Sequence, residues 1–212
     1  MAAKKSAETT AKARATRAKP ALSVALPVQA FATAAAFERW LRSHHQISKG
    51  IWLRLMKKAS HQPGVSYAEA LDIALAFGWI DGQIKTYDAD SWLRKFVPRG
   101  ARSIWSKINR TKALALIAEK RMQPAGLEQV ERAKKDGRWQ AAYDSARNAR
   151  PSADFAAALA ASPRAAAFFA TLNGANRYAV LFRVQAPKKP ETRARKIEEL
   201  ILMLEQGRKI HG

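Results

Sequence analysis

The spacing of apolar residues predicts a mixture of helices and strands in the first half of the chain. Apolar side chains recur every three or four positions across residues 33–45 and again across 66–78, which is the spacing of an amphipathic helix. Residues 51–57 instead alternate between two faces, as a strand does. Residues 83–87 and 91–97 have the pattern of two further strands, and the short polar segment between them predicts a hairpin. The order helix, strand, helix, strand, strand predicts a small α+β layer.

Polar residues and glycines mark the ends of these elements. Ser66 and Glu69 have the spacing of a capping box at the start of the second helix, and Gly78 is placed to end that helix in a left-handed conformation. The pair Asp81-Gly82 predicts a turn. Pro98 should close the last strand, because proline has no N–H to donate to a ladder.

From Ser103 onward the apolar pattern is helical only. Ser103 or Ser106 is a candidate N-cap for a helix that extends to about Lys120, and Pro124 and Gly137 bracket the next helix. Further helices are predicted at 153–161, from Ser162-Pro163, from Asn173 and from Pro190 to Gly207.

These patterns divide the chain into four regions. Residues 1–28 are basic and carry too little apolar area to offset their ordering entropy, so they predict a disordered arm. We expect an α+β domain with a Trp-rich motif region at 29–137, a linker at 138–152 and a helical domain at 153–212. The predicted fold class is therefore α+β, with a small N-terminal α/β layer that contains a short antiparallel hairpin, followed by a mainly helical C-terminal half.

Composition excludes several classes of site. The 212 residues include no cysteine, which excludes disulfides, thiolate metal ligands and cysteine nucleophiles and suits a reducing cytoplasm. No apolar run approaches the roughly 20 residues of a membrane-spanning helix, and the N-terminus lacks the apolar core of a secretory signal. The four histidines have no metal-binding spacing, and no phosphate-binding loop or GxSxG elbow occurs. We expect a cytoplasmic protein without a cofactor, metal site or integral membrane segment, and we name no catalytic residue.

The formal net charge of +21 favours a polyanionic partner such as nucleic acid, although a solvated basic surface is an equally good explanation. The candidate polyanion surface is a set of basic residues around the start of the last helix: Lys188, Lys189, Arg193, Arg195 and Lys196. Positive charge at a helix N-terminus opposes the helix dipole, so an anion would be stabilising there. Nearby glutamates could supply that negative charge from within the protein.

A second candidate site is a cleft built from polar residues and tryptophans at the ends of predicted elements: Trp79, Asp81, Arg99, Trp105, Ser106, Lys107 and Asn109. If these ends meet at one edge of the sheet, Arg99 and Lys107 could bind a small carboxylate or phosphate while a tryptophan stacks on its apolar part. The alternative is structural. Asp81 would then pair with Arg99, Ser103 would cap the helix, and the tryptophans would lie in the core.

Two sets of motifs carry a resemblance to a known family. The first set comprises residues 74–82 (ALAFGWIDG), 98–99, 103–109 (SIWSKIN) and 121–122, and the second comprises 176–178 (NRY) and 186–197 (APKKPETRARKI). Together they resemble the bacterial YdeI/OmpD-associated family, also labelled bacteriocin-protection proteins, from about Thr33 to Gly207. The resemblance implies an intracellular bacterial protein with a role in tolerance to bacteriocins or envelope stress, and it implies no reaction or cofactor.

The sequence therefore favours a non-enzymatic binding protein of this family type. A nucleic-acid-associated protein and an enzyme acting on a small anionic substrate are the two alternatives. They differ in what they require: the first requires salt-dependent binding of a polyanion, and the second requires that Asp81, Arg99 and Lys107 converge in one pocket.

Overall fold

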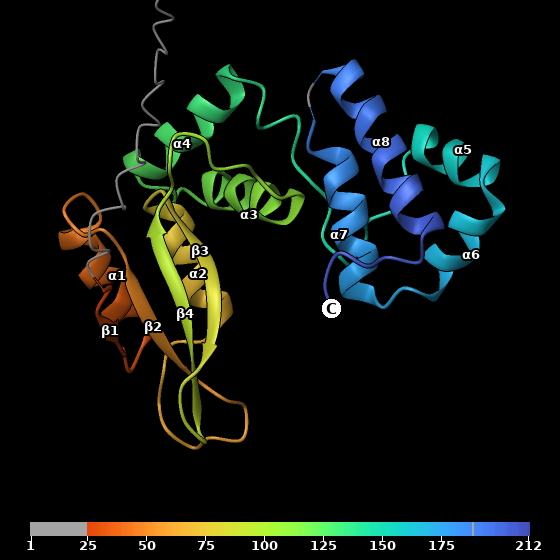
Figure 1. Cartoon of the computed structure of the whole chain (residues 1–212). Coiled ribbons are helices and arrows are strands. Elements are labelled where there is room, and N and C mark those ends of the chain that lie inside the picture. The colour runs from red at the N-terminus through yellow and green to blue at the C-terminus, as the bar shows by residue number, and fades with distance from the viewer. Residues whose placement is uncertain (1–24, 188) are drawn as a thin grey trace, which may run out of the picture.

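The computed structural model describes residues 25–187 and 189–212, so most of the predicted arm lies outside the described residues (Figure 1). The described part contains four strands and eight helices, which confirms the α+β fold class. In chain order they are β1 (Val28–Gln29), α1 (Ala34–His44), β2 (Ile51–Met56), α2 (Tyr67–Ala76), β3 (Trp79–Thr86), β4 (Ser91–Pro98), α3 (Lys107–Ala118), α4 (Pro124–Lys135), α5 (Ala153–Ala161), α6 (Pro163–Thr171), α7 (Gly174–Gln185) and α8 (Pro190–Glu205).

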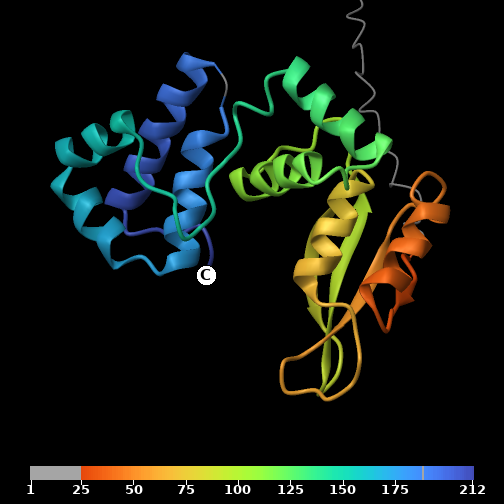
Figure 2. The ribbon, with the colours of Figure 1, turned by 180° about the vertical axis from the view of Figure 1, so that it is seen from behind.

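The four strands form one sheet in the order β1-β2-β4-β3. β1 runs parallel to β2, and the other two pairings are antiparallel. Helices α1 and α2 cover one face, where the β2 side chains Ile51, Leu53 and Leu55 are buried among their apolar residues (Figure 2). No helix of the described chain covers the opposite face, which is turned toward the viewer in Figure 1.

Local capping chemistry places the helices as predicted. Thr33 caps α1 by accepting from the Ala36 N–H, and Ser66 with Glu69 forms the complete capping box of α2. Gly78 follows α2 with φ of 74°, a left-handed conformation that glycine adopts without a steric penalty. Pro163 and Pro190 stand at the first positions of α6 and α8, where a missing N–H costs nothing.

Two boundary predictions are wrong. Asp81 and Gly82 form no turn, because both lie within β3, where the pairing with β4 is irregular between Asp81 and Ile84. Such an irregularity bends an edge strand without ending it. Val28 was expected in the disordered arm, but it pairs with Trp52 in β1, because the edge of β2 offers it backbone partners.

The apolar residues form two separate cores. One joins the sheet to α1–α4, and the other lies among α5–α8. Residues 138–152 form no helix or extended strand, yet Trp139 and Ala142 pack into the first core and Ala149 into the second. The segment expected to be a linker is therefore anchored at both ends.

We predict that Gly126→Ala destabilises the protein by about 2 kcal/mol or more, because its new methyl group would overlap the Ala76 carbonyl where α4 crosses α2. Gly174→Ala is the matched control. Gly174 opens α7 with nothing within 4 Å of the added methyl group, so this change should be neutral or stabilising by up to about 1 kcal/mol. Urea unfolding of both variants measures the difference. Equal midpoints for Gly126→Ala and the parent would contradict the close approach of α2 and α4.

Candidate functional site

A cavity of about 360 Å³ lies where α2, β3 and the start of α3 meet. Three of the predicted cleft residues, Asp81, Ser106 and Asn109, line it together. Tyr67, Lys112 and Tyr143 are the other principal polar residues of its wall, which also includes the apolar side chains of Leu71 and Ile108. We call this space the Asn109 cavity. It includes part of the predicted cleft, but the basic residue in its wall is Lys112 and not Arg99 or Lys107.

Asp81 is held by Tyr67 and Arg94. The Tyr67 hydroxyl donates to Asp81 Oδ2 at 2.8 Å, and Arg94 Nε donates to the same oxygen at 2.9 Å. Arg94 also forms an ion pair with Asp81 through Nη2, and only 11% of the Asp81 side chain is exposed. Burial, reinforced by the hydrogen bond to Asp81, raises the pKa of Tyr67 to about 12. The hydroxyl therefore stays protonated near neutral pH, and Arg94 rather than Arg99 neutralises Asp81.

The start of α3 leaves the side-chain amide of Asn109 without a protein partner. Ser106, and not Ser103, caps the helix by accepting from the Asn109 backbone N–H at 3.1 Å. In the equivalent place at α2, Glu69 reaches back to the Ser66 N–H and closes a capping box. Asn109 is only 8% exposed, and its side-chain amide makes no hydrogen bond to any residue that the structure describes. Its amide is therefore available to a molecule in the cavity.

Tyr143 forms the wall opposite α2. Its backbone carbonyl accepts from the Lys107 N–H at 2.8 Å, and its own N–H donates to the Trp105 carbonyl at 3.0 Å. These two bonds hold the segment after α4 against the start of α3. Burial raises the pKa of the Tyr143 hydroxyl, so it too is neutral near pH 7. No periodicity marks Tyr143 in the sequence, and the only signal is an aromatic residue within a predicted linker.

The two tryptophans of the predicted cleft belong to the core. Trp79 is 1% exposed, and its indole N–H donates to the His45 carbonyl at 3.1 Å. Trp105 is 2% exposed and packs edge-to-face on Trp139 with ring centroids 4.9 Å apart. Neither Trp79 nor Trp105 lines the Asn109 cavity. Both tryptophans are therefore core residues, as the structural alternative predicted.

The two cations expected to bind an anion do not line the cavity. Arg99 is buried, donates from Nη1 to the Ile104 carbonyl at 3.0 Å and lies 3.8 Å from the centre of the Trp105 ring. Burial, followed by the nearby charge of Arg138, lowers the pKa of Arg99 to about 10. Lys107 points to the surface and pairs with Asp144 at 2.8 Å. Asp81, Arg99 and Lys107 therefore do not converge in one pocket.

The charges that do line the cavity cancel within the protein. Asp81 has its partner in Arg94, and Lys112 pairs with Asp72 at 2.6 Å. The polar character of the cavity therefore comes from the neutral groups of Asn109 and the hydroxyl-bearing side chains.

The candidate polyanion surface at α8 is only partly free. Lys188 lies outside the described residues, and Lys189 and Arg195 are exposed. Arg193 instead donates to Asp154 Oδ2 at 2.6 Å, to the Val184 carbonyl at 2.6 Å and to Ser152 Oγ at 2.8 Å, which ties the starts of α5 and α8 to the end of α7. Lys196 forms an ion pair with Glu199 on the same helix. Internal carboxylates thus neutralise part of this surface.

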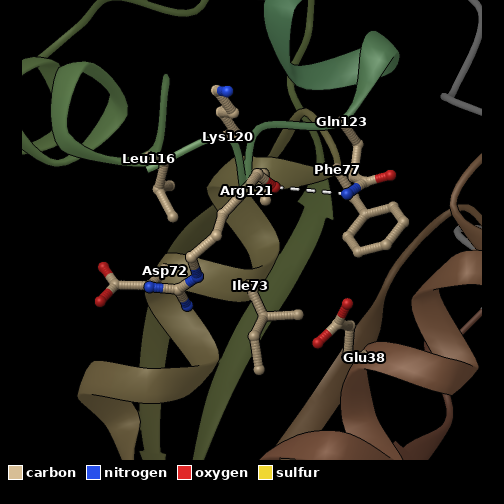
Figure 3. A pocket seen from close by; sticks show the side chains of 9 residues that line it. Glu38, Asp72, Ile73, Phe77, Leu116, Lys120, Arg121 and Gln123 are labelled. Carbon is tan, nitrogen blue, oxygen red and sulfur yellow. Dashed lines mark hydrogen bonds between the residues drawn. The ribbon is translucent and has the colours of Figure 1, made fainter. Parts of the chain in front are cut away.

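A smaller cavity of about 270 Å³ lies between α1, α2 and the end of α3 (Figure 3). Its lining includes two acidic residues, Glu38 and Asp72, and two basic residues, Lys120 and Arg121, so its formal charges are balanced. Figure 3 shows the hydrogen bond of 3.3 Å from the Gln123 side chain to the Arg121 carbonyl, which fixes the chain after α3. No cluster of three or more His, Asp or Glu side chains in the described ranges could hold a metal ion.

We predict that the Tyr67 hydroxyl makes the parent protein sensitive to alkali. Its pKa is higher in the folded protein than the ordinary value of 10.0, so the stability that it contributes is complete below about pH 10 and is lost as the pH rises toward 12. Tyr67→Phe should lower the free energy of unfolding by roughly 1 kcal/mol at neutral pH and should flatten the loss of stability between about pH 10 and about pH 12. Urea unfolding at these pH values measures both effects. Tyr87→Phe, at a tyrosine that is 51% exposed, is the control, and identical alkaline profiles for Tyr67→Phe and the parent would contradict the assignment.

We also predict opposite outcomes for two neighbouring arginines of α8. Arg193→Ala should destabilise the protein by about 1–3 kcal/mol, because it removes charge-assisted hydrogen bonds that join three helices. Arg195→Ala removes an exposed side chain with only an attraction to Glu199, so the free energy of unfolding should change by less than about 0.5 kcal/mol. Chemical denaturation followed by circular dichroism distinguishes them, and equal effects would contradict a structural role for Arg193.

Comparisons with known families divide the chain at the same place as the two cores. Residues 29–129 match a domain of unknown function, and residues 148–207 match the family described as Bacteriocin-protection, YdeI or OmpD-Associated. Searches of the curated proteins and of the solved structures gave no significant match.

No helix in the described part of the chain is long and apolar enough to cross a membrane. The first motif set lies in the former region and the second set in the latter, so the family model covers less of the chain than the resemblance implied. The C-terminal region of the chain, at residues 148–207, is therefore similar to the family described as Bacteriocin-protection, YdeI or OmpD-Associated.

Proposed function

We propose that this protein is a non-enzymatic, cytoplasmic binding protein that contributes to tolerance of bacteriocins or envelope stress, and that its N-terminal domain holds a small ligand in the Asn109 cavity. The family of the C-terminal domain supports the biological role. The cavity supports the binding role, because its volume of about 360 Å³ falls within the range of small-molecule pockets.

The observation that carries the proposal is the side-chain amide of Asn109, which belongs to a residue in the cavity wall and has no hydrogen-bond partner among the described residues. Polar side chains at largely buried positions nearly always have hydrogen-bond partners, so we expect a molecule in the cavity to bond to this amide. The other polar groups on which the site depends have partners within the protein: Asp81 has Tyr67 and Arg94, and Lys112 has Asp72. Asn109 offers both a donor and an acceptor to a ligand at the start of a helix.

The chemistry of the wall favours a neutral ligand that carries hydroxyl or amide groups. An anion would find no unpaired cation among the described residues that line the cavity, because Lys112 is paired and Arg99 and Lys107 lie elsewhere. A neutral ligand can exchange hydrogen bonds with Asn109 and the tyrosine hydroxyls while its apolar part rests on Leu71 and Ile108. The anionic ligand considered from the sequence therefore loses its main support.

The same geometry favours binding over catalysis. The Ser106 hydroxyl oxygen in the cavity wall is engaged as the N-cap of α3. No histidine lines the cavity in the described chain to act as its base. The raised pKa values of Tyr67 and Tyr143 also keep their hydroxyls protonated, which suits hydrogen bonding to a ligand rather than proton abstraction.

We expect a thermal-shift screen of the full chain to separate the ligand classes. Neutral sugars, polyols and amides at millimolar concentration should raise Tm, whereas phosphate and citrate should raise it less. Asn109→Leu should abolish the rise, because leucine fills a similar volume without the amide. Asn148→Leu, at an exposed asparagine outside the cavity, should keep it. A larger shift with the anions, an equal shift in Asn109→Leu, or no shift with any neutral compound would overturn the proposal.

A further inference from the structure

The open face of the sheet presents aromatic and basic side chains together. Register places Trp52 opposite Lys95, and Lys85 opposite Leu93, on the face away from the helices. The contact between the Lys85 ammonium and the Trp52 ring, 4.3 Å from its centroid, confirms that both side chains lie on this face. This is the side of the sheet seen in Figure 1, which no helix of the described chain covers.

A second aromatic residue extends this face at the hairpin between β3 and β4. Tyr87 is 51% exposed, and the Arg54 guanidinium lies 5.4 Å from the centre of its ring. A cation thus lies beside each of two aromatic rings. The Trp52 side chain is partly exposed, and Tyr87 is about half exposed. Aromatic rings of this kind bury most of their area in a typical protein, so their exposure beside cations indicates an interaction surface.

The open face of the sheet keeps a net positive charge after the ion pairs among its own residues are counted. Arg54 pairs with Asp88 at 2.9 Å. Neither Lys85 nor Lys95 has a carboxylate partner among the residues that the structure describes. The surplus positive charge therefore lies around Trp52 and not on the helical side of the sheet, where Asp81 and Arg94 cancel.

We propose that this open sheet face binds single-stranded nucleic acid, with Lys85 and Lys95 against phosphates and with bases stacked on Trp52 and Tyr87. Single strands suit the surface better than a duplex does, because only unpaired bases expose the faces on which an aromatic side chain stacks. Binding would be largely independent of sequence, since every base has such a face. The site is separate from the Asn109 cavity, which lies on the helical side of the sheet.

The test uses the full chain with a fluorescent oligothymidylate of about twelve nucleotides, a length within the usual range for one such platform. Lys85→Glu with Lys95→Glu reverses two charges on the sheet face. Arg164→Glu with Lys209→Glu makes the same change of net charge on exposed residues of the C-terminal half, outside the candidate polyanion surface. Fluorescence anisotropy should show at least tenfold weaker binding for the sheet pair and less than threefold weaker binding for the control pair. The slope of log affinity against log salt should fall by about 1.4 in the sheet pair, as expected for two lost phosphate contacts.

Stacking is tested separately from charge. Trp52→Leu should weaken binding about tenfold, and Trp52→Phe, which keeps an aromatic face, should weaken it much less. Circular dichroism verifies that both variants are folded. Equal losses in the two charge pairs, binding to the duplex as tight as to the single strand, equal affinities for the two Trp52 variants, or binding to anionic phosphatidylglycerol vesicles in place of the oligonucleotide would each overturn the proposal.

Discussion

Two buried guanidinium groups fix the loop between β4 and α3, and the candidate site depends on that loop. Arg99 donates to the carbonyl of Ile104, and Arg138 donates to the carbonyl of Ser103 at 2.6 Å. Burying two like charges is costly unless each is compensated. Asp136 lies 2.7 Å from the Arg138 guanidinium, and the face of the Trp105 ring stabilises Arg99. The loop is therefore held by charge-assisted contacts rather than by regular secondary structure.

This loop connects the sheet to the helical half of the protein. It presents Trp105 to the backbone of Tyr143 and brings Ser106 to the start of α3. The Tyr143 ring then packs edge-to-face on Phe182 of α7 with ring centroids 5.3 Å apart, and the next residue, Asp144, accepts from the Tyr178 hydroxyl at 3.0 Å. The segment that contains Tyr143 and Asp144 thus completes the wall of the Asn109 cavity and contacts α7 of the helical C-terminal half.

The sequence predicts those parts of the fold that local chemistry decides. The caps at Thr33, Ser66 and Ser106 follow from side chains that bond their own helix. Asp81-Gly82 was misassigned because pairing with β4 overrides the local turn preference of this dipeptide.

The candidate site was less predictable, because it depends on contacts between distant residues. Asp81, Ser106 and Asn109 do share a cavity, but the directions of Arg99 and Lys107 are set by Ile104 and by Asp144. No local pattern reveals such partners. Tyr143 was missed for the same reason, since its place is set by backbone bonds to Trp105 and Lys107, far away in the chain.

A crystal structure of the full chain soaked with a neutral hydroxyl- or amide-bearing ligand tests the central claim most directly. The account predicts ligand density in the Asn109 cavity, with a polar ligand atom roughly 3 Å from the Asn109 side-chain amide. Density elsewhere, or an Asn109 amide that turns back onto the Ser106 N–H as Glu69 does onto Ser66, would contradict it.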